Sequence, residues 1–193
     1  MAERLAGGNT ALALLANSLA TGAVLAALIL AFGAVSGAHW NPLVTLASVV
    51  SGGRPGRDLG PYVLAQFAGA IAGVSAAELM FGAPLFTFSQ KARGGIGQIL
   101  GEAVATFGLL AVATYGSRRS VDAAAVGVGA YIAAAYWFTS STSFANPAVT
   151  LARSFTNSMT GIRPADVPGF LLGQTFGFAA FAGFARWLDP RKE

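Results

Sequence analysis

The stretch NPLVTLA at residues 41–47 decides the fold, and it returns as NPAVTLA at residues 146–152. The two copies lie 105 residues apart and differ at one position, where the first has Leu43 and the second has Ala148. Each copy opens with asparagine, a preferred N-cap, followed by proline, which is favoured in the first helical turn because its missing N–H is not needed there. Each motif therefore predicts the start of a helix.

Both predicted helices are too short to cross a bilayer. Each one follows a long apolar segment and continues for about ten residues before polar or glycine-rich sequence, which places the helices at about 42–50 and 147–155. Helices of this length reach roughly 15 Å, or half of a hydrocarbon core of roughly 30 Å. Two such half-helices that enter from opposite sides of the membrane would meet tip to tip at its midplane.

The composition predicts a membrane protein. Hydrophobic residues make up 54% of the chain and charged residues 10%, whereas an ordinary soluble domain carries about 25% charged residues. The twelve Lys and Arg are scattered in short pairs, which argues against a nucleic-acid partner and for loop charges that set topology. With no cysteine, one histidine and eight acidic residues, we expect no metal, no cofactor and no enzymatic activity.

Five apolar segments are long enough to span a bilayer. They cover about residues 10–35, 59–80, 96–115, 121–138 and 167–187. Together with the two half-helices, they predict an all-α membrane protein with five transmembrane helices and two re-entrant half-helices. We expect one domain, residues 1–193, with the lipid bilayer as its surroundings.

The repeated motif divides the domain into two halves. Residues 83–193 contain span, span, half-helix and span, whereas residues 1–82 contain span, half-helix and span. An odd number of spans in a complete repeat makes the two repeats inverted. The first repeat is therefore expected to be truncated, lacking a first transmembrane helix or reflecting a start assigned too late. We expect a lipid-facing groove beside residues 11–31 and an amino terminus on the outer side.

Several residues besides the two motifs carry a resemblance to a known family. They are Ser36-Gly37-Ala38-His39 before the first motif, Glu102 in the third span, and Gln66 and Gln174 in the two closing spans. Together they resemble the aquaporin superfamily, the major intrinsic proteins. The segment STSFANPAVT at residues 141–150 is similar to the branch of bacterial aquaporins associated with arsenic resistance. This resemblance implies a multi-pass channel of the bacterial inner membrane, and a homotetramer if the first helix is present.

Physical reasoning supports a pore at the half-helix tips. Two helix N-termini that face each other concentrate partial positive charge, which repels protons and cations but not neutral solutes. The side-chain oxygens of Asn41 and Asn146 cap the helices, and the amide N–H groups are left to donate to a passing solute. Carbonyl groups of residues 37–40 and 143–145 would accept from it. The alternative is that both asparagines only cap.

Four other polar residues have structural roles to weigh against pore roles. His39 either lines the pore or only holds its loop. Glu102, Gln66 and Gln174 are expected to tie loop backbone to the spans rather than touch solute, because polar groups inside a membrane are expensive to bury.

The solute prediction depends on the outer constriction. Most aquaporins have arginine directly after the second Asn-Pro-Ala, and here the position is Val149. By the family's spacing, the remaining constriction positions fall on Thr21, Ala134 and Ser143. This small, uncharged ring predicts a wide pore for glycerol, urea or fully protonated arsenite, as well as water. The residues assigned to the pore are Asn41, Pro42, Asn146, Pro147, Ala148, Thr21, Ala134, Ser143, Val149 and His39.

Some alternatives stay open at this stage. Arg153, one turn beyond Val149, is expected to face the outer loop or solvent, and Leu43 either narrows the lumen or does not. A non-conducting truncated protein and a water-selective channel are alternative functions. An ion-coupled transporter would need an ionisable residue at the midplane, for which Glu102 and His39 are the candidates.

Overall fold

The computed structural model describes residues 1–189, which contain helices and no strand. Five of the helices are long and apolar enough to cross a membrane. They are α2 (Thr10–Ser36), α4 (Leu59–Met80), α5 (Ile96–Ser117), α6 (Val121–Phe138) and α8 (Val167–Leu188). The predicted all-α membrane fold is confirmed, and the expected boundaries of the spans hold to within two residues.

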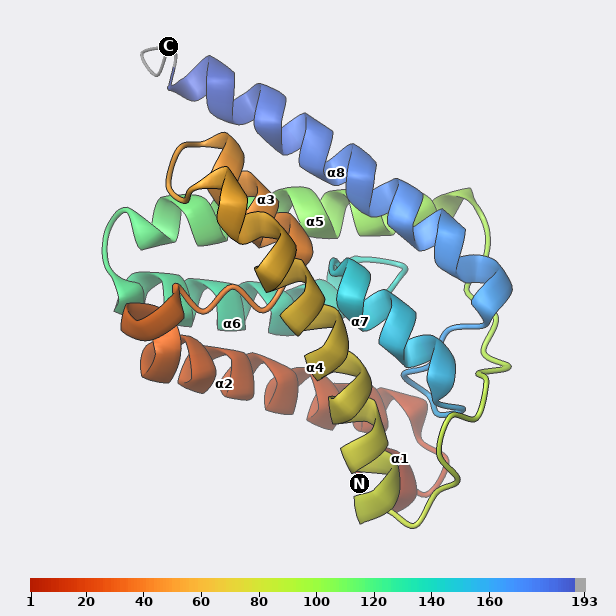
Figure 1. Cartoon of the computed structure of the whole chain (residues 1–193). Coiled ribbons are helices and arrows are strands. Elements are labelled where there is room, and N and C mark those ends of the chain that lie inside the picture. The colour runs from red at the N-terminus through yellow and green to blue at the C-terminus, as the bar shows by residue number, and fades with distance from the viewer. Residues whose placement is uncertain (190–193) are drawn as a thin grey trace.

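Short helices fill the space between these spans. The half-helices are α3 (Pro42–Val50) and α7 (Pro147–Ala152), and α7 continues as the 3-10 turn η2 (Arg153–Phe155). Figure 1 shows α3 and α7 lying end to end among the long helices. The remaining short elements are α1 (Ala2–Leu5), η1 (Gly56–Asp58) and η3 (Pro164–Asp166). The second half-helix therefore has the predicted extent, 147–155, with a tighter last turn.

Small residues let the spans pack closely. Helix α2 packs along α6, α5 packs along both α8 and α6, and α4 crosses α3 and α7. At the α2–α6 crossing, a Cβ on Gly22 would lie 2.6 Å from the carbonyl oxygen of Gly129, and a Cβ on Gly129 would lie 2.5 Å from that of Gly22. Backbones come this near in membranes because association there depends on van der Waals contact rather than on the hydrophobic effect.

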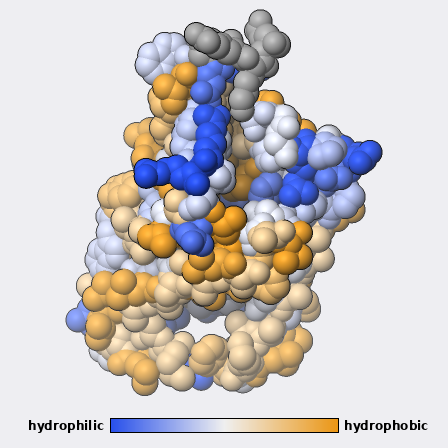
Figure 2. All heavy atoms as spheres, turned by 90° about the vertical axis from the view of Figure 1, so that its left-hand side faces the viewer, coloured by the Kyte–Doolittle hydropathy of each residue, from blue (hydrophilic) through white to orange (hydrophobic). Residues whose placement is uncertain are grey.

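Apolar side chains cover the outside of the helix bundle. Leu64 and Met80 on α4 are 73% and 76% exposed, and Val35 on α2 is 80% exposed. Figure 2 shows apolar residues over much of one face and hydrophilic residues gathered mainly in its upper part. Such a surface is suited to hydrocarbon, so the five spans define a multi-pass membrane protein.

A broad cavity of about 1440 Å³ opens between α1, α2, α4 and the last part of α7, with the loop that follows it. On α2 it is lined by residues such as Leu12, Asn17 and Ala20. It borders the first part, up to Ala20, of the segment at residues 11–31 beside which a lipid-facing groove was predicted.

The α2–α6 crossing yields a test of the packing. Gly129→Ala should lower the free energy of unfolding of the detergent-solubilised protein by about 1–3 kcal/mol, because the new methyl group meets backbone that cannot move aside. The loss should appear as a lower melting temperature. Gly69→Ala on α4 is the control, since a Cβ there meets nothing within 4 Å. Equal melting temperatures for the two variants would show that the crossing tolerates a wider separation.

Candidate pore

The two asparagines cap the half-helices, as predicted from the sequence. The side-chain oxygen of Asn41 accepts from the backbone N–H of Leu43 at 2.9 Å. That of Asn146 accepts from the N–H groups of Ala148 at 3.0 Å and Val149 at 3.3 Å. Both asparagines have extended backbone and are followed by proline in the first turn. Each tip is therefore a complete helix start with its positive end toward the other tip.

The same two side chains also join the tips to each other. The amide nitrogen of Asn41 donates to the carbonyl of Ala145 at 2.7 Å, and that of Asn146 donates to the carbonyl of Trp40 at 2.9 Å. The expectation that both amide groups are left for solute is therefore too simple. One N–H of each NH₂ group holds the opposite loop, and the second N–H remains.

The loops before both half-helices have unusual backbone. Ala38, Ser143 and Ala145 are non-glycine residues with φ values of 50°, 53° and 46°. This left-handed conformation costs on the order of 1–3 kcal/mol per residue and persists only where surrounding contacts enforce it. The contacts around the loops must therefore offset the energetic cost of this backbone conformation.

The expected ladder of carbonyl acceptors is partly occupied by protein. The carbonyls of His39, Trp40 and Ala145 accept from the side chains of Gln66, Asn146 and Asn41 respectively. Because a carbonyl oxygen has two lone pairs, each of the three can still accept one further hydrogen bond.

Glu102 anchors the second loop from α5, as expected. Its fully buried carboxylate accepts from the backbone N–H groups of Phe144 and Ala145, both at 2.8 Å. It also accepts from the amide of Gln174 at 2.6 Å, and that amide donates to Thr150 on α7 at 2.8 Å. The prediction that these polar residues tie the loop to the spans is confirmed.

Gln66 on α4 does the same for the first loop. Its amide donates to the carbonyl of His39 and, at 2.9 Å, to the hydroxyl of Thr45 on α3. Thr45 and Thr150 occupy equal positions in the two motifs, 105 residues apart. The two glutamines therefore hold the two half-helices in the same way.

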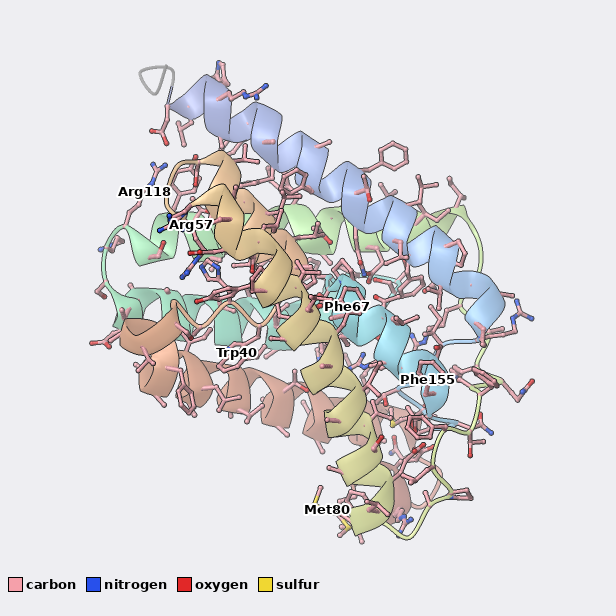
Figure 3. The ribbon with its side chains drawn as sticks, in the orientation of Figure 1. Trp40, Arg57, Phe67, Met80, Arg118 and Phe155 are labelled. Atoms are coloured by element: carbon pink, nitrogen blue, oxygen red, sulfur yellow. The ribbon has the colours of Figure 1, made fainter. Side chains whose placement is uncertain are left out.

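A cavity of about 470 Å³ passes the joined tips. At one end it is lined by Ser51, Ser117 and Arg118, and at the other by Ser143 and Arg153. In Figure 3, Arg118 lies at the left-hand end of α5, Trp40 lies in the middle of the molecule, and Phe155 lies toward the opposite end. Six of the residues predicted for the pore line this cavity: His39, Asn41, Asn146, Thr21, Ser143 and Val149.

The structure corrects one predicted constriction residue. Ala134 is exposed on the outside of α6, whereas Ile132 and Tyr136 line the cavity. Residues four apart share a helix face, and Ala124 and Val128 continue the same stripe. Ala134 lies between two members of this stripe in sequence and therefore on another side of the helix.

Other predicted residues support the pore without lining it. Pro42 and Ala148 are buried at the starts of the half-helices, and Pro147 is half-buried there. Leu43 packs against the core cluster that contains Leu110 and Phe181. The question left open by the sequence is thus answered, because the bulk of Leu43 points into protein and not into the lumen.

Arg153 meets its expectation only in part, because it borders the broad cavity beside the outer loop, residues 156–160, and also lines the cavity that passes the tips. Its guanidinium lines the cavity, donates to the Tyr136 hydroxyl at 3.2 Å and stacks 4.3 Å above the centre of the Phe144 ring. The reason is helical register, since Arg153 follows Val149 by four residues and η2 continues the helix of α7. The outer end of the cavity therefore has an arginine, although the position of Val149 is uncharged.

Sequence reasoning missed two aromatic residues of the outer end, Tyr136 and Phe144. Tyr136 is 3% exposed and Phe144 is 5% exposed, and both line the cavity. The four-residue stripe on α6 that ends in Tyr136 was the available indication, together with the need of a buried tyrosine hydroxyl for a partner.

Comparisons with known proteins agree with this geometry. Two capped half-helices that meet head to head beside a cavity, within a bundle of membrane-spanning helices, are the arrangement of a membrane channel. A profile described as "Major intrinsic protein" matches residues 4–117. The chain is 52% identical to the aquaglyceroporin AqpS of Rhizobium meliloti over 180 residues, which cover 93% of this chain and 77% of that protein. The chain belongs to the major intrinsic protein family.

Two more distant relatives carry related names. The chain is 35% identical to aquaporin NIP1-4 of Oryza sativa subsp. japonica over 86% of this chain and 62% of that protein. It is 33% identical to the glycerol uptake facilitator protein of Streptococcus pneumoniae over 55% of this chain and 52% of that protein.

The Glu102 network yields a second test. Glu102→Ala leaves two buried N–H groups without an acceptor, each worth about 1–3 kcal/mol, so thermal stability in detergent should fall clearly and solute flux should be lost. Asp122→Ala, an exposed position at the start of α6, is the matched acidic control and should change stability by less than about 1 kcal/mol. Wild-type flux through Glu102→Ala would mean that the loop holds its shape without the carboxylate.

Proposed function

We propose that this protein is a passive channel for small neutral solutes, conducting glycerol, urea and fully protonated arsenite together with water. The observation that carries the proposal is the cavity that passes both capped tips, where the second N–H of Asn41 and of Asn146 is left to bind solute. The names of the relatives, an aquaglyceroporin and a glycerol uptake facilitator, support the same solute class.

The groups along the cavity suit hydroxylated solutes. The Asn41 and Asn146 amides donate, the loop carbonyls accept, and the Ser143 hydroxyl has no hydrogen-bond partner among residues 1–189. A solute hydroxyl group both donates and accepts. It can therefore replace its hydrogen bonds to water with hydrogen bonds to these protein groups at little cost. Protonated arsenite carries three hydroxyl groups, as glycerol does, and is uncharged.

The outer end supports passage of solutes larger than water. Val149, Thr21 and Ser143 contribute small, uncharged side chains to it, beside the larger Tyr136, Phe144 and Arg153. Valine is much shorter than the arginine found at the position of Val149 in most aquaporins, and so leaves a wider opening there. A water-selective pore would need bulky side chains at the positions of Val149, Thr21 and Ser143 as well.

The distribution of acidic groups favours a passive channel over an ion-coupled transporter. No aspartate or glutamate among residues 1–189 lines the cavity. Glu102 is fully buried and is occupied by two backbone N–H groups and Gln174. An ion-coupling step would require an ionisable group that reaches the transported species, and of the two candidates named from the sequence only His39 lines the cavity.

We further propose that the protein works in the bacterial inner membrane and is built from inverted repeats, residues 1–82 and 83–193, with assembly into a homotetramer if the first transmembrane helix is present. The bacterial relatives, the apolar outer surfaces of the spans and the matching roles of Gln66 and Gln174 support this arrangement.

Solute flux tests the channel directly. Proteoliposomes that contain the purified protein should equilibrate glycerol and arsenite gradients faster than protein-free vesicles of the same lipid, as measured by stopped-flow light scattering. A proton ionophore should leave the rate unchanged, because no ion gradient drives the flux. Rates equal to the lipid background would identify a non-conducting protein.

Val149 decides the width of the outer end. Val149→Arg should lower glycerol flux by about tenfold or more and should lower water flux by less. The longer side chain narrows the opening, and larger solutes are affected first. Leu43→Ala is the control, since Leu43 packs into the core away from the lumen. Equal losses of glycerol and water flux in Val149→Arg would place Val149 away from the constriction.

A further inference from the structure

Arg153 gives the outer end of the cavity a positive charge that the motif position lacks. The guanidinium lines the same cavity as Val149, Ser143 and Thr21. Among residues 1–189, no carboxylate lies within ion-pair distance of it, whereas Arg54, Arg57, Arg118 and Arg163 each have one. Its charge is therefore available to act on a solute or ion at this end.

A directional chain of hydrogen bonds holds the guanidinium in place. The Thr21 hydroxyl donates to the carbonyl of Asn17 at 2.8 Å, so it can only accept from the Tyr136 hydroxyl, 3.3 Å away. The Tyr136 hydroxyl has then used its own proton and must accept at its oxygen, where Arg153 donates at 3.2 Å. Each hydroxyl proton in this series of hydrogen bonds therefore has a single acceptor. The series holds Arg153 against the cavity wall formed by α6 and α2.

The Phe144 ring provides the second constraint. The guanidinium carbon of Arg153 lies 4.3 Å from the ring centre, within the range of a cation–π contact. Together, the ring and the Tyr136 hydroxyl hold the charge to the side of the cavity, whereas an arginine at position 149 would project one helical turn deeper.

Arg93 is a useful contrast, because it stacks on the same ring at 5.0 Å but has a structural role. It donates to the carbonyls of Gly161, Met159 and Ser141 and to the hydroxyl of Thr142. Burial, and then the charge of Arg153, lower the pKa of Arg93 to about 10, so it stays protonated at neutral pH. Arg153 makes only one hydrogen bond to a described residue, which leaves further N–H groups of its guanidinium for the cavity.

We propose that Arg153, held by Tyr136 and Phe144, is the cation-excluding residue at the outer end of the pore. This inference rests on the proposed channel function and adds a division of labour to it. Val149 leaves the opening wide enough for polyols, and the arginine one turn further out repels cations that such an opening would otherwise admit. Neutral hydroxylated solutes pass and can accept hydrogen bonds from its remaining N–H groups.

The test separates charge from size. In proteoliposomes, Arg153→Gln and Arg153→Met should raise sodium and proton leak about tenfold or more, as expected for removing one charge a few ångströms from the path. Both variants should still conduct glycerol. Arg153→Lys should keep the leak at the wild-type level, because it keeps the charge. Arg119→Gln, an exposed arginine in the loop between α5 and α6, is the matched control for loss of a positive charge elsewhere.

The outcomes distinguish this inference from the channel itself. Wild-type protein that conducts no glycerol would overturn the proposed function. Suppose that all variants conduct glycerol and that Arg153→Gln and Arg153→Met leak no more cations than the wild type. That result would overturn only the role of Arg153. Loss of glycerol flux in both uncharged variants, with Arg153→Lys still active, would also overturn it, because Arg153 would then be needed for the pore as a whole.

Discussion

Two hydrogen bonds at the centre of the protein hold its pore together. The amide of Asn41 reaches the carbonyl of Ala145, and the amide of Asn146 reaches the carbonyl of Trp40. They offset the repulsion between two helix N-termini that face each other with partial positive charge. Each asparagine combines two roles, since its oxygen caps one helix and its amide N–H binds the opposite loop, and in the proposed channel its second N–H binds solute.

The surrounding membrane-spanning helices hold these loops through side-chain hydrogen bonds. Non-helical backbone at membrane depth is stable only where it is buried in protein or lines a cavity. Here Glu102 supplies acceptors for two N–H groups of one loop, and Gln66 supplies a donor for a carbonyl of the other. Both anchors stand on long helices that pack through close backbone contacts, so the left-handed residues of the loops are stabilised from outside.

Charge and width are separated along the cavity. The tips of α3 and α7 place fixed partial positive charge at the centre, and Arg153 adds a full charge toward the outer end. Val149 lies between them as an uncharged, short side chain. In the proposed channel, a solute that carries hydroxyl groups but no charge would meet hydrogen-bonding partners along this path, whereas a cation would meet two successive unfavourable regions.

The sequence alone determined the elements of this fold, because their causes are local. Asn-Pro at 41–42 and 146–147 sets both half-helix starts, the apolar runs set the spans, and repetition over 105 residues indicates that the tips are equivalent. Tertiary structure decided which side chains face the lumen. Helix rotation turned Tyr136 inward and Ala134 outward, and the 3-10 continuation of α7 brought Arg153 over the Phe144 ring. The stripe on α6 and the four-residue spacing from Val149 to Arg153 group these side chains locally, but which face of a helix meets the lumen depends on contacts between helices far apart in the chain.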